Sequence, residues 1–183
     1  MRCFWVNLNN HKYVEYHDKE WGVPLHDDKM LYELFILECF QSGLSWECIL
    51  NRREAFRQAF DDFDINKVIH YGEEKTARLL EDSSIIRNRK KIEAAIGNSR
   101  IIKSIQEEQG SFDSYIWNFT RGKVIFEPCD KNTSSVLSDT IANDLKKRGI
   151  RFAGSITVYS FLQAAGVING HTENCKLFCS KGI

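Results

Sequence analysis

A histidine and a cysteine in the segment "NGHTENC" are spaced for metal binding. His171 and Cys175 lie four residues apart, so one helical turn can place both side chains on the same face, as a zinc site requires. A closed site needs two further ligands, and Cys3 and His17 are candidates near the other end of the chain. Cys179 is a rival ligand, because it follows Cys175 at the same spacing. The spacing equally allows a surface histidine beside ordinary thiols.

A carboxylate on an apolar helix face is the second chemical feature. Leu31, Leu34, Phe35 and Glu38 follow one another at the spacing of a single helix face. Burying a charged carboxylate costs several kcal/mol unless it is paired or protonated. Glu38 therefore either pairs with an arginine or lines a pocket that binds a cationic or hydrogen-bonding ligand.

Aromatic side chains are dense near the N-terminus. Trp5, Tyr13, Tyr16, Trp21 and Trp46 include three of the four tryptophans of the chain. They are compatible with an ordinary core, or with the walls of a site for a planar ligand, where stacking on a nucleic-acid base contributes about 1–3 kcal/mol.

A basic cluster stands where a long helix is expected to begin. Arg87, Arg89, Lys90 and Lys91 fall in its first turns, although cations there oppose the helix dipole. The cluster is either a solvated charged face or, with the backbone N–H groups of the helix start, a phosphate site.

The elements that must hold these residues are helical. Apolar residues recur at helical spacing, and Asp, Ser or Thr precede several of the runs. The predicted helices span 27–40, 45–60, 64–71, 73–82, 85–109, 133–149 and 154–171. A strand is an alternative within 154–171, and residues 122–128 favour a short strand or extended turn. The fold class predicted is all-α.

Length and composition indicate a globular protein. The 183 residues suit a single domain over 1–183, with 43% hydrophobic and 27% charged residues. Acidic and basic residues cancel, so nucleic-acid binding cannot be argued from net charge. No signal peptide is recognisable, and no stretch approaches the roughly 18 consecutive apolar residues of a membrane span. We expect a cytoplasmic protein without membrane association, whose six cysteines are thiols or metal ligands rather than disulfides.

Several longer strings resemble the 3-methyladenine DNA glycosylase I family. They are "RCFW", "YVEYHDKEWGVP", "LECFQSGLSW", "IIRNRKKIEAAIGN" and "LKKRGIRFAGSITVYSFLQAAGVINGH", and they extend almost end to end. The resemblance implies a helix-hairpin-helix DNA glycosylase fold with one structural zinc ion joining the N- and C-terminal segments. It also implies a DNA repair enzyme that flips 3-methyladenine out of alkylated double-stranded DNA and hydrolyses its N-glycosidic bond. Free 3-methyladenine and an abasic site would be the products, with water as nucleophile, no strand cleavage, and a monomer as the default assembly.

The resemblance also implies roles for matching residues. The zinc ligands would be Cys3, His17, His171 and Cys175. Glu38 and Tyr16 would be catalytic, and the base would lie against Tyr13, Trp21, Trp46 and Trp5. DNA contacts would come from Gln41, Gly43 and Leu44 at the gap left by the base, and from a hairpin at Ser84, Ile85 and Ile86 with Lys91 nearby.

The chain departs from the family pattern at the hairpin and in its tail. Ser84 stands where a glycine is usual, which is compatible only with a turn that avoids positive φ. The short tail after Cys175 keeps Cys179 as an outside zinc candidate. Two other classes of function remain: an inactive zinc-containing DNA-binding module, and a helix-hairpin-helix glycosylase with lyase activity. The four-cysteine iron–sulfur spacing found in some enzymes of the last class is absent from this sequence.

Overall fold

The computed structural model describes residues 1–178, which form ten α-helices, a 3₁₀ turn at Asp61–Phe63 and two short strands. The helices are α1 (His11–Lys19), α2 (Asp28–Gln41), α3 (Trp46–Leu50), α4 (Arg53–Ala59), α5 (Ile65–Val68), α6 (Glu73–Glu81), α7 (Arg89–Gln109), α8 (Phe112–Asn118), α9 (Val136–Lys147) and α10 (Ser155–Ala164). The strands are β1 (Ile125–Phe126) and β2 (Ile168–Asn169). The structure is therefore mostly helical as predicted, with a short strand inside 122–128.

Side-chain caps explain where several helices begin. Asp27 accepts a hydrogen bond from the amide of Met30, and Ser45 accepts one from the amide of Cys48. Asn88 caps α7, and Ser135 forms a capping box at the start of α9. Each cap satisfies a backbone donor that the helix itself leaves without a partner.

Three predicted helix bounds were wrong. The segment 45–60 is two helices, because Arg52 leaves helical geometry and its side chain donates to the carbonyl of Cys48. The segment 85–109 becomes helical only at Arg89. The segment 154–171 stops at Ala164, since Gly166 has φ +69° and a Cβ there would lie 2.3 Å from the backbone of Val23. Only glycine fits that turn and that close approach.

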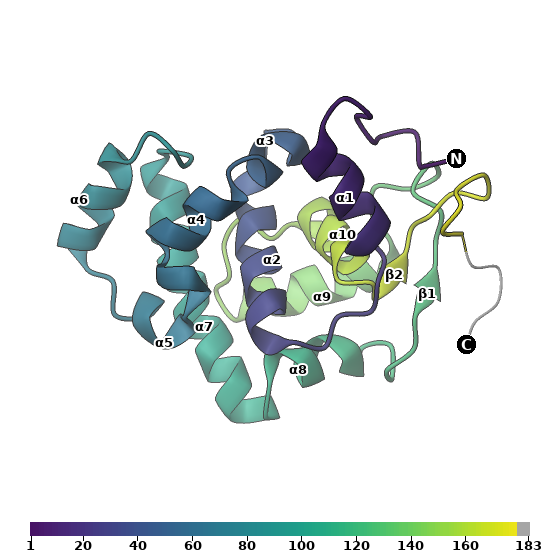
Figure 1. The fold of residues 1–183 in the computed structure, drawn as a ribbon. Helices are drawn as coiled ribbons and strands as arrows, with labels where there is room; N and C mark the ends of the chain where they lie inside the picture. The colour runs from purple at the N-terminus through teal and green to yellow at the C-terminus, as the bar shows by residue number, and fades with distance from the viewer. Residues whose placement is uncertain (179–183) are drawn as a thin grey trace.

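Helix α2 lies at the centre of the molecule (Figure 1), with α7, α8 and α10 packed against it. Ten of its fourteen residues are buried, from Leu31 to Phe40. A helix that is buried on every side must be apolar nearly all round, as this one is. Two of its buried residues, Glu33 and Glu38, are the exceptions.

The two ends of the described chain lie together. Strands β1 and β2 pair in parallel, with Ile125 opposite Ile168. The amide of Lys176 donates to the carbonyl of Met1 at 2.8 Å. Figure 1 shows the N-terminal segment, β1 and β2 on one side of the molecule, opposite α5 and α6. This arrangement brings residues 3 and 175 close together.

None of the helices within residues 1–178 combines the length and the hydropathy that crossing a membrane requires.

Candidate active site and metal centre

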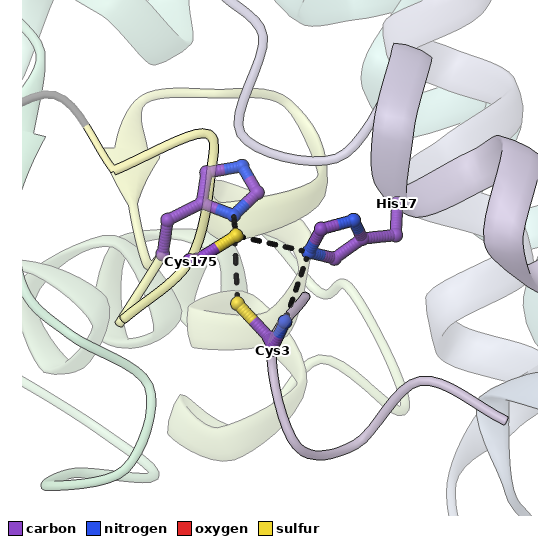
Figure 2. A group of neighbouring side chains, drawn as sticks. Cys3, His17 and Cys175 are labelled. Atoms are coloured by element: carbon purple, nitrogen blue, oxygen red, sulfur yellow. Dashed lines mark hydrogen bonds between the residues drawn. The ribbon is translucent and has the colours of Figure 1, made fainter. Parts of the chain in front are cut away.

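Four buried side chains from both ends of the chain form a compact cluster. The ligand atoms of Cys3, His17, His171 and Cys175 all lie within 4.8 Å of one another. Cys175 Sγ is 3.5 Å from His17 Nε2 and 3.4 Å from His171 Nδ1. Figure 2 shows Cys3, His17 and Cys175 pointing toward one another from the N-terminal segment, α1 and the C-terminal segment. The four residues predicted as zinc ligands are thus brought together.

The outer nitrogens of the two imidazoles are held by hydrogen bonds. His17 Nδ1 lies 2.9 Å from the carboxylate of Asp18, and His171 Nε2 lies 3.2 Å from the carbonyl of Trp21. Both partners accept, so each outer nitrogen donates and the nitrogen facing the cluster is left unprotonated. Two thiols and two such nitrogens, 3.4–3.5 Å apart, make a donor set that could hold a metal ion.

The cysteines that the structure describes are free thiols. The five cysteines within residues 1–178 form no disulfide with one another. Cys179, the rival ligand, lies outside the described residues.

A cavity of about 270 Å³ opens next to this cluster, between α1, α2 and α10. Its size is near the lower end of the range for small-molecule sites. Nearly half of its lining residues are aromatic, and the lining includes every residue predicted to be catalytic or base-binding. These are Trp5, Tyr13, Tyr16, Trp21, Glu38 and Trp46.

Glu38 and Glu33 are both 3% exposed on α2, but their surroundings differ. Glu33 accepts from Arg53 at 2.5 Å and from Arg57 at 2.9 Å, so its charge is paired. Glu38 Oε2 has no hydrogen-bond partner within residues 1–178, and the side chain lines the cavity. Burial without a partner raises the pKa of Glu38 to about 8. The arginine pairing considered for Glu38 belongs to Glu33.

Two tyrosines from one face of α1 stand beside Glu38. Burial, followed by the charges of Glu47 and Glu38, raises the pKa of Tyr13 to about 12. Burial, with Glu38 next, also raises the pKa of Tyr16 well above its usual value. Both phenols therefore stay protonated at neutral pH and can donate hydrogen bonds within the cavity.

The aromatic wall also contacts the metal cluster. The rings of Trp5 and Trp21 meet edge-on with centroids 4.8 Å apart. Trp5 lies 5.3 Å from the His17 ring, and Trp21 lies 4.7 Å from the His171 ring. The positions of His17 and His171 therefore also fix the positions of the Trp5 and Trp21 rings in the cavity.

Helix α10 contributes a wall that the sequence interpretation did not include. Ile156, Tyr159, Ser160 and Gln163 line the cavity at i, i+3, i+4 and i+7, which is one face of a helix. The available signal was a polar stripe on an otherwise apolar helix. For that segment the sequence predicted only a helix, with a strand as the alternative, and no site residue.

The turn between α2 and α3 projects beside the cavity. Gly43 has φ +78°, with open space where a Cβ would point, and Leu44 is 38% exposed. Gln41 lines the cavity, and a second groove of about 630 Å³ runs from Gln41–Leu44 to the start of α10. The predicted DNA-contacting turn is thus next to the predicted base pocket.

Lys91 points into the protein. It is 8% exposed, and its Nζ donates to the carbonyls of Phe40 and Ser42 at 2.8 and 2.6 Å. It thereby caps the C-terminal end of α2 at the projecting turn. Its neighbour Lys90 is exposed, as are Arg87 and Arg89, so most of the basic cluster is a solvated face.

Two helical hairpins flank the projecting turn. In the α6–α7 hairpin the amide of Ser84 donates to Asp82, and Ile85 is buried while Ile86 is half-buried. Ser84 is not among the residues with positive φ, so serine is accommodated there without strain. In the α9–α10 hairpin, Gly154 precedes α10 and no side chain caps its first turn. The first residues of α10 line the groove that leads to Leu44.

Comparison with known proteins agrees with this geometry. The sequence model of the methyladenine glycosylase family matches residues 5–179. DNA-3-methyladenine glycosylase 1 of Escherichia coli (strain K12) is 41% identical over 181 residues, covering 95% of each chain. A crystal structure of 3-methyladenine DNA glycosylase I superposes with a TM-score of 0.93 at 39% identity, covering 98% of this chain and 100% of that one. The Staphylococcus aureus 3-methyladenine DNA glycosylase I, whose structure concerns 3-methyladenine recognition, superposes with a TM-score of 0.88 at 36% identity over 91% of each chain. The chain therefore belongs to the methyladenine glycosylase family.

Proposed function

We propose that this protein is a DNA-3-methyladenine glycosylase that excises 3-methyladenine from alkylated double-stranded DNA. One observation carries the proposal beyond family membership. Glu38 is buried, unpaired and accompanied by aromatic rings in a cavity of about 270 Å³. A buried ionisable group that carries this cost and faces a cleft is a candidate for binding or catalysis.

The residue types suit a methylated base. A nucleotide of 3-methyladenine carries a positive charge, which the faces of aromatic rings attract. Tyr16 and Trp46 have ring centroids 5.4 Å apart and form part of the wall against which the base would stack. A cation beside Glu38 favours its charged form, so base binding converts the protonated carboxyl to a carboxylate. Trp46 Nε1, also buried and unpaired, supplies a donor for the base.

The reaction needs little acid catalysis, because the methylated base leaves as a neutral molecule. Oxygen of a water molecule bonds to C1′ while the bond from C1′ to the base nitrogen breaks. The bonding electron pair stays on the base, and the proton released by water passes to solvent. Glu38 and Tyr16 hold the base, and the aromatic side chains that contact its faces displace bulk water from it. None of the described residues that line the cavity is a lysine, which supports water as the nucleophile and hydrolysis without strand cleavage.

DNA is bound at the projecting turn. A base must leave the helical stack before it can enter the cavity, and methylated bases leave more easily than normal ones. Gly43 and Leu44 occupy the gap in the duplex, with Gln41 between that gap and the cavity. A phosphate lies at the uncapped start of α10, whose backbone amides and dipole favour an anion. A phosphate contact at Ser84, Ile85 and Ile86 stays a prediction, and Lys91 positions the turn from inside.

One zinc ion in the cluster has a structural role. Two cysteines and two histidines fill all four positions of tetrahedral zinc, which leaves no position for a reacting water. Bound there, zinc links the N-terminal segment, α1 and the C-terminal segment. The bond to His17 fixes α1, and with it the neighbouring Tyr16. All of these groups come from one chain, so a monomer is sufficient for activity.

An inactive DNA-binding module is the competing proposal. A module of that kind gains nothing from an unpaired buried carboxylate, which lowers stability unless a ligand uses it. The cavity and Glu38 therefore favour the enzyme.

Incubation of the purified protein with methylated duplex DNA tests the proposal. We expect free 3-methyladenine, separated by chromatography, and abasic sites that break only after alkali treatment. DNA binding without any base release would support the inactive module. Strand breaks that form before alkali treatment would instead indicate a lyase.

A further inference from the structure

Gln163 is a buried polar residue that the mechanism above leaves without a role. It lies in the last full turn of α10, is 7% exposed, and lines the cavity. Its Nε2 atom has no hydrogen-bond partner within residues 1–178. A buried amide donor without a partner costs stability, and most such donors in native proteins are paired. The Gln163 donor is without a partner in the cavity that we propose binds the base.

The surroundings hold the amide of Gln163 in one place. Its backbone carbonyl accepts from the amide of Gly22 at 3.0 Å, which joins the end of α10 to the residue after Trp21. Its side chain packs against Gly170: a Cβ at that position would stand 2.6 Å from Nε2 and 2.9 Å from the Trp21 ring. The absence of a side chain at Gly170 thus makes room for both groups. A binding group fixed in this way loses little conformational freedom when a ligand arrives.

Gln163 and Glu38 do not satisfy each other. Each has a buried polar atom without a partner, although both line the same cavity. Burial alone accounts for the raised pKa of Glu38. The cavity therefore offers one unpaired carboxyl and one unpaired amide donor to whatever enters it.

An adenine edge has the complementary pattern. Its exocyclic amino group donates, and a neighbouring ring nitrogen accepts, whereas the matching guanine edge carries two acceptors. We propose that Gln163 is a specificity-determining residue whose Nε2 donates to a ring nitrogen next to the amino group of 3-methyladenine, while Glu38 accepts from the amino group. The proposal rests on the proposed function, since it names how that base is distinguished from other purines.

Base analogues combined with a substitution test the hydrogen bond directly. Tryptophan fluorescence, from the rings that line the cavity, gives the Kd of free 3-methyladenine and of its 1-deaza and 7-deaza analogues, each lacking one ring nitrogen. We expect one analogue to bind the wild-type protein about tenfold or more weakly than 3-methyladenine. Gln163→Leu should bind that analogue and 3-methyladenine equally, because the donor is gone. Gln58→Leu, on the exposed face of α4, should behave as wild type.

The binding measurements can also contradict the proposed role of Gln163. The inference is overturned if, for each analogue, the ratio of its Kd to that of 3-methyladenine is the same in wild type and in Gln163→Leu. It is also overturned if Gln163→Leu binds 3-methyladenine as tightly as wild type does. If Gln163→Leu does not fold, Gln163→Met keeps a similar size and removes the donor. The ratio of two Kd values within one protein does not depend on its active fraction. A wild-type protein that does not bind 3-methyladenine would overturn the proposed function as well. Wild-type binding without coupling to residue 163 would overturn this inference alone.

Discussion

Glu33 and Glu38 are five residues apart on α2 and equally buried, yet only one of them is paired with arginine. The charge of Glu33 is compensated by its arginine partners, whereas the burial of Glu38 opposes folding until a ligand arrives. A residue that lowers stability in a cleft is typical of a binding site. The Glu38 side chain therefore links the stability of the protein to its chemistry.

The pH dependence of stability should reveal this cost. The pKa of Glu38 is about 8 in the folded protein, above its value in the unfolded chain. The folded form holds this proton more tightly, so the contribution of Glu38 to stability is greatest below about pH 4 and falls as pH rises toward 8. Glu38→Gln removes this loss. We expect equal melting temperatures for Glu38→Gln and wild type at pH 4, and a melting temperature several degrees higher for Glu38→Gln at pH 8.

Differential scanning calorimetry across this pH range is the measurement, with Glu81→Gln on the exposed face of α6 as control. The control should follow wild type throughout. A constant difference between Glu38→Gln and wild type at all pH values would contradict a raised pKa at Glu38.

At the scale of elements, the turn between α2 and α3 depends on Lys91 of α7. The two carbonyls that Lys91 caps lie at the end of α2 and at the first residue of the turn. Burial lowers the pKa of Lys91, but these two acceptors favour the ammonium form that donates to them. The long helix thus holds the turn that we propose binds DNA in place through one side chain.

Removing that ammonium should loosen the turn. Lys91→Met keeps the apolar stem and leaves two carbonyls without their donor, which we expect to cost about 1–3 kcal/mol in the free energy of unfolding. The KM for methylated DNA should rise more than kcat falls. Lys90→Met changes the exposed neighbour and should stay within about 0.5 kcal/mol of wild type. Urea unfolding and steady-state kinetics measure both effects, and similar results for the two variants would remove the special role of Lys91.

The exposed Leu44 belongs to the same element. Its proposed role is to fill the gap left by the flipped base, so Leu44→Ala should reduce kcat/KM on duplex DNA about tenfold. The binding of free 3-methyladenine should be unchanged, since the cavity is intact. Leu8→Ala, 67% exposed in the N-terminal segment, is the matched control. Equal losses on duplex DNA and on the free base would place Leu44 in the pocket rather than at the gap.

At the scale of the whole molecule, the metal cluster joins three segments that are distant in sequence. It also contacts the aromatic wall through Trp5 and Trp21. The proposed zinc ion would therefore couple metal binding to folding, and its loss should disturb the Trp5 and Trp21 rings of the cavity.

Cys3→Ser should lose the metal and destabilise the ends of the chain. We expect about one zinc per wild-type chain by elemental analysis and none in Cys3→Ser, which should melt at a clearly lower temperature. Cys48→Ser, a half-buried cysteine outside the cluster, should retain both the zinc and the stability. A metal-free wild-type protein as stable as the zinc-bound protein would disprove a structural zinc.

The sequence predicted the helical fold, the cap residues Asp27 and Ser45, and the grouping of the four metal-ligand candidates. Local caps and apolar spacing predicted the helical fold and the cap residues. The resemblance to the glycosylase family predicted the grouping of the metal-ligand candidates. The sequence did not reveal the break at Arg52, whose side chain donates to the carbonyl of Cys48, or the turn at Gly166, which depends on the distant backbone of Val23. Gln163 was missed because its importance lies in the lack of a partner, which only the packed structure reveals.

We propose that base excision depends on the unpaired carboxyl of Glu38. The single-turnover rate of 3-methyladenine release from methylated duplex DNA tests it most directly, for wild type, Glu38→Gln and the surface control Glu81→Gln. We predict a folded Glu38→Gln protein that still binds DNA but releases the base at least about 100-fold more slowly, with the control at the wild-type rate. A folded Glu38→Gln protein that releases 3-methyladenine at the wild-type rate would contradict the claim.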